Sequence, residues 1–492
     1  MRATGTAFPE PRVAETAPAA YFHSTSRADG WTTACALSTA AVSLGYAIHA
    51  KNGNFSVESL LWLTVALASA VMAAWNGIHR RIELAAAMGL LRVLGIGLIF
   101  QIILLLTANP GTGLWVPLGP FCSLTWLAAG VVGLGFWRIP AARWALPLLL
   151  ATHFFMGAWV IRHTPRPLID VHVVQQAGCE ELAHGHNPYA VRPVDIYGPD
   201  THFYAPGTVK DGHLTVGCPY PPLSILLTLP SYMLTGDFRY AQLIAVTLAA
   251  ALMALARGGR IGFAAAALYL LTPRGFFVLE QGWTEPFVVL MLAGTVFCAC
   301  RFPRWTPLML GLLLASKQYI FIAFPAALLL APRPWLSMRF WRFWIVAAAV
   351  ALAVTLPMAL WDVHEFANSV LNIRDIFRVD SLSYLSAVAL VTGWEPGGWV
   401  KYVALVPVIG LVLFKAPHTP SGFAASAGLL FLVLFAFAPH SAANYFFGCI
   451  GAMCCAVAAT QPMMKPVRAP GRSGIPRIFI RTGASGQIGR FT

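Results

Sequence analysis

Long apolar stretches separated by short polar ones recur along most of this chain, from Trp31 almost to Thr460. Many stretches are roughly 17 to 22 residues long, the length of helix that crosses about 30 Å of hydrocarbon. Only helices and closed barrels satisfy all of their backbone hydrogen bonds inside lipid, and stretches of this length favour helices. The pattern therefore predicts an all-α polytopic membrane protein.

We expect about 14 transmembrane helices. Two further apolar pieces, 221–236 and 380–393, are short, contain Pro or Ser and adjoin polar loops, so we predict interfacial or re-entrant helices there. The predicted spans are 31–50, 57–75, 84–107, 113–136, 143–161, 239–256, 260–277, 285–300, 305–316, 318–331, 341–360, 397–414, 421–438 and 444–460.

Composition supports the same class. Of the 492 residues, 58% are hydrophobic and 11% are charged, and the mean hydropathy is +0.68. One soluble core cannot hide that much apolar surface. The net charge of +14 does not indicate nucleic-acid binding, because the basic residues lie in short clusters between the apolar stretches and in the last segment of the chain.

The basic clusters also predict the orientation, since cations in short loops are retained on the cytoplasmic side. With both termini in the cytoplasm, the outer segments are 162–239, 279–285, 361–396 and 439–444. The same choice places the basic clusters inside: Arg80 and Arg81, Arg138 and Arg143, Arg257 and Arg260, Arg301 and Arg304, Arg333, Arg339 and Arg342, and Lys415.

This topology divides the chain into five parts. No compact apolar run of the signal-peptide type precedes the first span, which we therefore expect to anchor the protein. The absence of eukaryotic sorting signals favours a bacterial inner membrane. The parts are a polar cytoplasmic N-terminus at 1–29, expected to be disordered, additional N-terminal helices at 30–142, a core at 143–331 with the long outer loop 162–238, C-terminal transmembrane helices at 332–460, and a basic cytoplasmic tail at 461–492.

Asp170 follows the fifth predicted span, at the start of a short helical pattern. Val173, Val174 and Ala177 return at helical spacing, and Gly185 to Pro188 break the pattern. A helix along the membrane surface would hold the carboxylate at the boundary between lipid and water. Asp170 is either the N-cap of that helix or a reactive group.

Glu285, Lys317 and Arg274 lie within or beside predicted spans, where ionisable residues are costly and are functional candidates by default. Interhelical pairs or snorkelling side chains are the alternative interpretation. The outer-loop cysteines Cys179 and Cys218 form a disulfide if the loop faces an oxidising compartment, and the sequence leaves bridged and free states open.

A series of motifs follows the fifth predicted span. The motifs are Asp170, Val173, Ala177, Leu182 and Gly185, the turn Asn187-Pro188-Tyr189, Tyr220-Pro221-Pro222-Leu223 with Leu229-Pro230, the run from Glu280 to Glu285, and the helix from Gly311 to Lys317. In this order they resemble the GT-C superfamily of glycosyltransferases, most of all glycosyltransferase family 87, whose characterised members include polyprenyl-phosphate-mannose-dependent mannosyltransferases. The resemblance covers about residues 143 to 331, with a weaker echo at 440–445.

The resemblance implies a GT-C-like helical bundle and a division of roles. In that superfamily an acidic residue just after an early transmembrane helix acts as the general base, and the matching position is Asp170. Lys317, Arg274 and His440, in that order, would stabilise the departing prenyl phosphate. His440 and Asn444 flank an outer helix end, where Asn444 serves equally well as a helix cap. Further substrate-binding candidates are Glu285, Gln281, His172, Asn187, Tyr189, Tyr220 and Asn444.

Two features depart from the family. Some GT-C relatives pair two acidic residues around a divalent ion, but the second residue after Asp170 is His172. The loop histidines show no zinc spacing either, so we expect neither metal nor cofactor. Typical members also place the acidic loop after the first helix, whereas here it follows the fifth predicted span. Nothing in the extra helices indicates their role.

The sequence thus predicts an inverting membrane glycosyltransferase of cell-envelope glycolipid biosynthesis. It would move a sugar, with mannose as the leading candidate, from a polyprenyl-phosphate donor to a glycolipid, glycan or protein on the extracytoplasmic face. Its expected partners are the donor, the acceptor and membrane lipids, without nucleic acid. The alternatives are a secondary transporter or lipid flippase, although no internal repeat is evident, and a catalytically inert scaffold.

Overall fold

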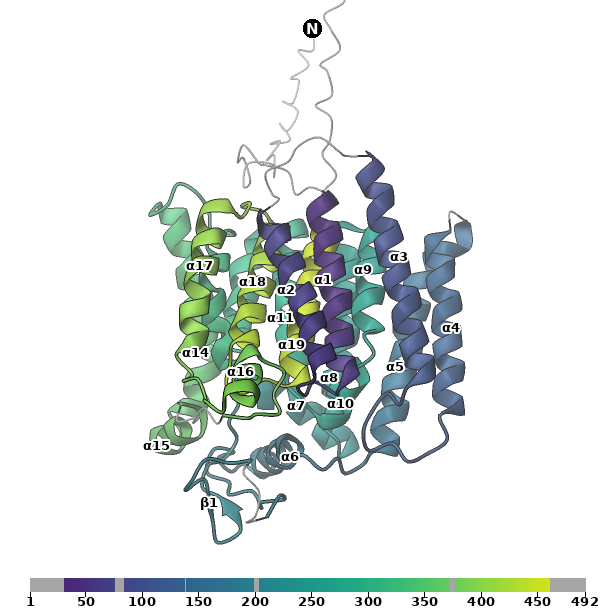
Figure 1. Cartoon of the computed structure of the whole chain (residues 1–492). Helices are drawn as coiled ribbons and strands as arrows, with labels where there is room; N and C mark the ends of the chain where they lie inside the picture. Colours follow the sequence, from purple (N-terminus) through teal and green to yellow (C-terminus); the bar gives the residue numbers. More distant parts are fainter. Residues whose placement is uncertain (1–30, 76–83, 138, 199–202, 372–376, 461–492) are drawn as a thin grey trace, which may run out of the picture.

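The computed structural model describes residues 31–75, 84–137, 139–198, 203–371 and 377–460. The predicted tails at 1–29 and 461–492, and the predicted inner-loop cations Arg80, Arg81 and Arg138, lie outside these residues. The described chain is a helical bundle in which the axes of most long helices are roughly aligned (Figure 1). The predicted all-α class is confirmed, since the described strands are β1 (Val209–Lys210) and β2 (His213–Leu214).

The long helices lie where the apolar stretches placed them. Seven described helices are long and apolar enough to cross a membrane, or up to eight if one bent pair counts as a span. The bounds of the first three match the prediction to the residue. The long helices are α1 (Trp31–Ala50), α2 (Val57–Trp75), α3 (Leu84–Thr107), α4 (Gly119–Phe136), α5 (Ala145–His163), which follows the short η2 (Pro140–Trp144), α8 (Arg239–Arg257) and α14 (Met338–Ala359).

Two helices near the C-terminus form the centre of the bundle. Every residue of α18 (Pro420–Ala436) is buried except one alanine, and α19 (Ala443–Ala459) exposes little beyond the tyrosine in its first turn. A helix that is apolar all round has no face for water and belongs in the interior. Helix α19 packs against α1, α8, α9 (Gly259–Leu270), α11 (Glu285–Arg301) and α18.

The additional N-terminal helices are part of this bundle. Helix α1 packs against α2, α3 and α19, while α3 and α4 both pack against α9. A Cβ at Gly97 on α3 would lie 2.6 Å from Val42 of α1, so the absence of a side chain there lets these two helices approach closely. These helices therefore share the core of the predicted catalytic region.

The predicted total of about 14 spans is not confirmed. The predicted span 260–277 is bent by 49° between α9 and α10 (Gly275–Gln281). Helix α12 (Thr306–Leu314) has nine residues, about 14 Å at 1.5 Å per residue, and is too short to cross the hydrocarbon. After it come η4 (Gln318–Ala323) and α13 (Phe324–Ala327), also short. The remaining bundle helix is α17 (Val400–Lys415), and the short η3 (Pro303–Trp305) precedes α12.

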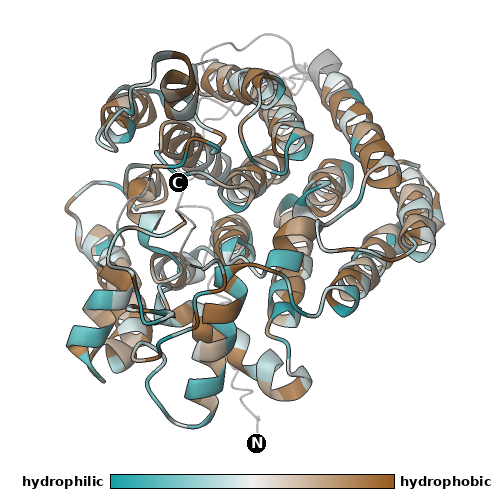
Figure 2. Cartoon of the chain, turned by 60° about the horizontal axis from the view of Figure 1, so that its bottom comes forward, coloured by the Kyte–Doolittle hydropathy of each residue, from teal (hydrophilic) through white to brown (hydrophobic). Residues whose placement is uncertain are grey.

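Short elements gather at one end of the bundle. Helix α6 (Asp170–Ala183) lies across this end, beside the β1–β2 hairpin (Figure 1). The apolar pieces at 221–236 and 380–393 form α7 (Pro222–Thr235) and α16 (Tyr384–Thr392), which are too short to span, as predicted. Figure 2 brings this end forward and colours many of its segments hydrophilic. The other short elements are α15 (Val363–Phe366) and the π-helical η5 (Ala367–Leu371).

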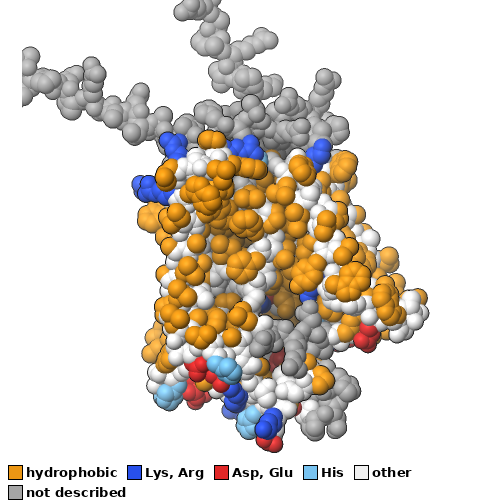
Figure 3. All heavy atoms as spheres, turned by 90° about the vertical axis from the view of Figure 1, so that its left-hand side faces the viewer, with side chains coloured by type: hydrophobic (Ala, Val, Ile, Leu, Met, Phe, Trp, Pro, Cys, Tyr) orange, Lys and Arg blue, Asp and Glu red, His pale blue; other side chains and the backbone are white. Residues whose placement is uncertain are grey.

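The acidic side chains lie mainly at one end of the bundle. On the face seen in Figure 3, hydrophobic side chains cover the middle, the charged side chains at the end opposite α6 are Lys and Arg, and Asp, Glu and His lie toward the α6 end together with further Lys and Arg. At the basic end, Arg301 donates from Nε to the carbonyls of Leu255 (3.2 Å) and Ala256 (3.0 Å). The distribution agrees with the charge pattern of the sequence, and which end faces the cytoplasm stays a prediction.

Candidate functional site

Asp170 is the first residue of α6 and stands at the end of the bundle where α6 lies. Its Oδ1 accepts the backbone N–H of Val171 at 2.8 Å and the hydroxyl of Tyr197 at 3.3 Å. The same hydroxyl accepts the backbone N–H of Asp170 at 3.2 Å. The N-cap position belongs to Ile169, so the predicted N-cap placement of Asp170 is wrong by one residue. The carboxylate is thus hydrogen-bonded both to Tyr197, in the loop after α6, and to the backbone at the start of α6.

Aromatic rings surround this carboxylate and partly shield it from water. The Tyr197 ring lies 4.4 Å from that of Phe203 and 5.6 Å from that of Tyr204. The Tyr204 hydroxyl is buried and lies close enough to Asp170 to favour the charged form of its carboxylate. Burial raises the pKa of Asp170, and the hydrogen bonds from Val171 and Tyr197 oppose that rise. A carboxylate of this kind is a better proton acceptor than an exposed one.

A second segment, just before α16, reaches the same aromatic group. Arg378 lies over the Phe203 ring, with its guanidinium carbon 4.8 Å from the ring centroid. Its Nε donates to Asp380 Oδ1 at 2.9 Å. Burial opposes ionisation of Asp380, but the hydrogen bond and charge of Arg378 outweigh it and lower the pKa of this carboxyl. His440, a predicted site residue, lies close enough for its charge to act on Asp380 as well.

Sequence reasoning missed Arg378. The signal that could have found it is an arginine in a segment predicted to lie outside, where cations are scarce. The structure shows why position along the chain was insufficient. Arg378 donates its backbone N–H to the Pro439 carbonyl at 2.9 Å, so the segments before α16 and after α18 meet beside the Asp170 loop.

Lys317, Glu285 and Asn444, all three predicted site residues, form a buried cluster. Lys317 Nζ donates to Glu285 Oε1, and Asn444 Nδ2 donates to Glu285 Oε2 at 2.7 Å. Glu285 begins α11, Asn444 lies in the first turn of α19, and Lys317 lies between α12 and η4. All three residues are at most 5% exposed. The interhelical pair, which was the alternative interpretation of Lys317, is therefore present.

Three tyrosines surround the ammonium group of Lys317, and we call them the tyrosine cage. The distances from Nζ to the ring centroids are 5.2 Å for Tyr220, 5.4 Å for Tyr445 and 5.7 Å for Tyr319. Such distances permit cation–π attraction, which strengthens away from water. The cage holds the positive charge in place where an ordinary lysine would reach for solvent.

Tyr220 connects the two clusters. Burial, followed by the charges of Glu285 and Asp170, raises its pKa well above the ordinary value, so both carboxylates lie within electrostatic range of its hydroxyl. The Tyr220 carbonyl accepts the hydroxyl of the fully buried Tyr189 at 3.1 Å. The backbone N–H of Tyr189 donates to Asn187 Oδ1 at 3.0 Å, which fixes the turn that carries Tyr189. Asn187 and Tyr189 thus position Tyr220.

Arg274 and Gln281 contact a different segment, the α3–α4 loop. Arg274 donates from Nη1 to the Asn109 carbonyl at 2.9 Å, and Gln281 reaches the Thr112 hydroxyl at 3.5 Å. Between them, the buried Glu280 accepts the backbone N–H groups of Thr112 (2.7 Å) and Gly113 (2.6 Å). This arrangement, the Glu280 clasp, joins α10 to the additional N-terminal helices.

Arg239, a fully buried arginine that sequence reasoning also missed, connects Glu280 to the segment between α5 and α6 that leads to Asp170. Arg239 donates from Nη1 to the carbonyls of Thr164 (2.8 Å) and Glu280 (2.9 Å), and pairs with Asp237 at 2.6 Å. His172 stands beside it, with its ring 5.2 Å from that of Phe238. Burial and the Arg239 charge lower the pKa of His172 to about 4, so His172 is neutral near pH 7.

Cys179 and Cys218 are both free in the structure, so the disulfide that the sequence left open is not formed. Cys179 Sγ lies 3.3 Å from the Thr228 hydroxyl, and Cys218 Sγ lies 3.9 Å from Gln175 Oε1. Burial raises the pKa of Cys179 to about 11 and that of Cys218 to about 12. Both behave as buried structural thiols.

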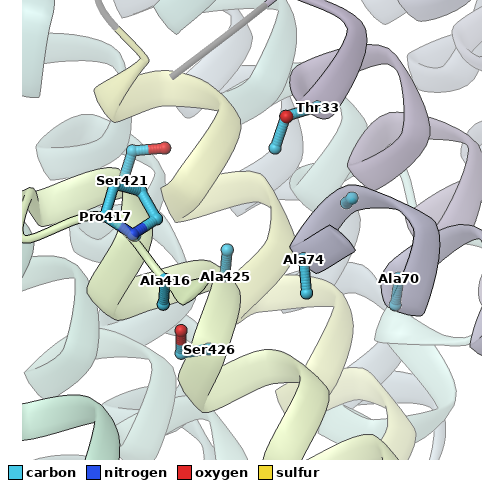
Figure 4. Close-up of a pocket in the computed structure, with 10 residues that line it drawn as sticks. Thr33, Ala70, Ala74, Ala416, Pro417, Ser421, Ala425 and Ser426 are labelled. Atoms are coloured by element: carbon cyan, nitrogen blue, oxygen red, sulfur yellow. The ribbon is translucent and has the colours of Figure 1, made fainter. Parts of the chain in front are cut away.

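Two further features lie apart from these clusters. Within the described ranges, no three His, Cys, Asp or Glu side chains lie close enough together to hold a metal ion. A cavity of about 30 Å³ lies between α1, α2 and α18 at the end opposite α6, and small side chains line it (Figure 4). None of the predicted site residues borders this cavity.

Comparison with known proteins gives little. No protein-family profile matches the chain, and no curated protein matches it. A solved structure, that of ArnT from Cupriavidus metallidurans bound to undecaprenyl phosphate, aligns with 67% of this chain at 15% identity and a TM-score of 0.39. The aligned part spans 61% of the ArnT chain.

Proposed function

We propose that this protein is a GT-C-type glycosyltransferase that takes a sugar from a polyprenyl-phosphate donor on the outer face of a membrane. The observation that carries the proposal is the half-buried Asp170 carboxylate, which Tyr197 holds at the start of a surface helix. Its charge acts on Tyr220, whose ring centroid lies 5.2 Å from the ammonium of the buried Lys317. The family resemblance in the outer-loop motifs agrees with this assignment. It also makes mannose the leading candidate for the sugar and a glycolipid, glycan or protein the acceptor.

Asp170 would act as the general base. Its carboxylate takes the proton of an acceptor hydroxyl while that oxygen attacks the anomeric carbon from the face opposite the phosphate. The bond between the anomeric carbon and the phosphate oxygen breaks, and its electron pair leaves with the prenyl phosphate. One bond forms and one breaks at the same carbon, so the configuration inverts. The raised pKa of Asp170 favours this proton transfer near neutral pH.

Lys317 would stabilise the departing phosphate. Its ammonium group is kept dry by the tyrosine cage, and an electrostatic interaction is stronger in such surroundings than in water. Glu285 and Asn444 hold the group in one position, so no reorganisation is needed as charge develops. Arg274 is the weaker candidate, because its contacts run to the α3–α4 loop.

The position of the site suits a lipid-linked donor. Helix α6 lies across the end of the bundle, and Leu168, just before Asp170, is 81% exposed. The prenyl tail can remain in the hydrocarbon while its phosphate reaches the polar end. We place this end outside a bacterial inner membrane and both termini inside, following the positive-inside rule. Cell-envelope glycolipid synthesis is the process that fits.

The test is sugar transfer by the purified full-length protein. Radiolabelled polyprenyl-phosphate mannose and a membrane lipid extract are incubated with wild type, Asp170→Asn and Glu181→Gln. Glu181 lies on the same helix, half-exposed and paired with His186 at 3.0 Å, and is the matched control. We expect Asp170→Asn to lose about 10²- to 10⁴-fold in rate, the usual range for a general base, and Glu181→Gln to stay close to wild type.

Two other outcomes would contradict the proposal. Equal transfer by wild type and Asp170→Asn would remove the base assignment. No turnover with any prenyl-phosphate sugar would favour the transporter or flippase interpretation, and the same protein reconstituted in vesicles would then be assayed for lipid translocation.

A further inference from the structure

Arg378 differs from the other cations of the site in how its charge is held. It pairs with Asp380, two residues away on the same segment, and the side chains of the pair are 25% and 52% exposed. An exposed ion pair of this kind contributes about 0 to 1 kcal/mol and exchanges partners easily. Arg378 is therefore positively charged, partly open to solvent and only weakly bound to Asp380.

The buried cations have no such freedom. Lys317 is bound to Glu285, its side chain is 6% exposed, and removing its partner would leave an unpaired charge in the interior. Arg239 donates to two backbone carbonyls and to Asp237. Both groups are fixed in place by the fold.

Arg378 also contacts the aromatic group that surrounds Asp170. Its guanidinium lies over Phe203, whose ring is 4.4 Å from that of Tyr197, and the Tyr197 hydroxyl bonds Asp170. The buried Tyr204 hydroxyl lies in the same group, beside the Asp170 carboxylate.

We infer that Arg378 binds the phosphate of the prenyl donor beside Asp170, exchanging Asp380 for the phosphate. The inference rests on the proposed function and adds a residue that the family motifs do not contain. The planar guanidinium offers two parallel N–H groups, which match two phosphate oxygens as well as they match the carboxylate of Asp380. Asp380 is exposed enough to turn into water when the phosphate arrives.

Charge balance explains why a second cation is needed. The donor is a phosphodiester with one negative charge, and the departing monoester gains up to one more, since its second pKa is about 6. Lys317 is already neutralised by Glu285, and Asp170 adds a negative charge nearby. Arg378 freed from Asp380 supplies the net positive charge that the leaving group requires.

Binding of the carrier alone tests the inference, because no chemistry is involved. The full-length protein in lipid nanodiscs is titrated with undecaprenyl phosphate and, separately, with undecaprenol, which lacks the phosphate. The readout is the ratio of the two affinities. We expect Arg378→Ala to reduce the preference for the phosphate by about 10- to 100-fold, as loss of a charge-assisted contact does, and Arg378→Lys to recover part of it.

Two variants serve as controls. Arg192→Ala removes another exposed arginine of the same outer region, which pairs with Glu365 at 2.7 Å, and should leave the preference unchanged. Asp380→Asn removes the competing carboxylate and keeps the arginine, so phosphate binding should be equal to wild type or stronger. If Asp380→Asn weakens binding as much as Arg378→Ala does, the pair is structural and the inference is wrong.

The outcome also separates this inference from the proposed function. A wild type that does not prefer undecaprenyl phosphate over undecaprenol contradicts the proposed donor class itself. A clear wild-type preference that survives in Arg378→Ala overturns only the role of Arg378.

Discussion

Lys317 and Glu285, 32 residues apart in the chain, form an ion pair inside the bundle, and Asn444 satisfies the second carboxylate oxygen. Burying two charges costs several kcal/mol each, and the pair regains this only when geometry and hydrogen bonding are complete. Here three structural elements each supply one member, and three tyrosine rings enclose the ammonium group. The cluster is thus intolerant of losing a single partner.

We therefore expect Lys317→Met or Glu285→Gln alone to destabilise the protein by about 3 to 5 kcal/mol, because each leaves the other partner buried and uncompensated. The double variant should be closer to wild type than the sum of the two single changes. Thermal unfolding of the four proteins in one detergent measures this coupling. Strict additivity would contradict the buried pair.

The proposed role of Asp170 as general base predicts how kcat/KM depends on pH. Burial raises its pKa, and only the ionised carboxylate accepts a proton, so kcat/KM should fall as the pH drops through that raised value. The acid limb should lie above the value of about 3.9 for an exposed aspartate. Tyr197→Phe removes a hydrogen bond that favours the charged form and should shift the limb to higher pH. A limb shifted to lower pH in Tyr197→Phe would contradict this account.

The Glu280 clasp should stabilise the contact between α10 and the α3–α4 loop. A Cβ at Gly111 would lie 2.6 Å from Glu280 Oε2, so Gly111→Ala must displace either the loop or the carboxylate. Glu280→Gln removes one charge-assisted acceptor and should cost about 1.5 to 3 kcal/mol. Thermal unfolding measures both, with Gly119→Ala as the control, since a Cβ at Gly119 meets no atom within 4 Å.

Cys179 and Cys218 should resist alkylation in the folded protein and react fully after unfolding. Burial keeps both thiols protonated, with pKa values of about 11 and about 12, and the thiolate is the reactive form. Maleimide labelling at pH 8 without reductant, followed by peptide mass spectrometry, reads each site separately. Peptides joined by a disulfide after unfolding would show that the bridge forms in the cell.

Much of the helical architecture could be predicted because apolar length is a local property. Three helices begin and end where the pattern placed them, and α7 and α16 are as short as their polar punctuation indicated. The prediction failed where helices are broken, at α9–α10 and from α12 to α13. In these places apolar composition continues through the break, so hydropathy alone cannot locate it.

The candidate site divides in the same way. Ionisable residues in apolar surroundings are visible in sequence, and Lys317, Glu285, Asn444 and Tyr220 do lie together. Arg378 and Arg239 were missed, and the contacts of Arg274 and Gln281 run to the α3–α4 loop. No local pattern predicts which of the segments between the helices contact each other.

The sequence by itself determined that the chain is helical, that it belongs in lipid, and that polar chemistry is concentrated in a few segments, because the need of the backbone to bond within each helix makes these local matters. Only the tertiary structure decided which charges are partners. Lys317 with Glu285, and Arg378 beside the Asp170 loop, are brought together by packing between distant elements, and the free energy of a buried charge depends on that packing.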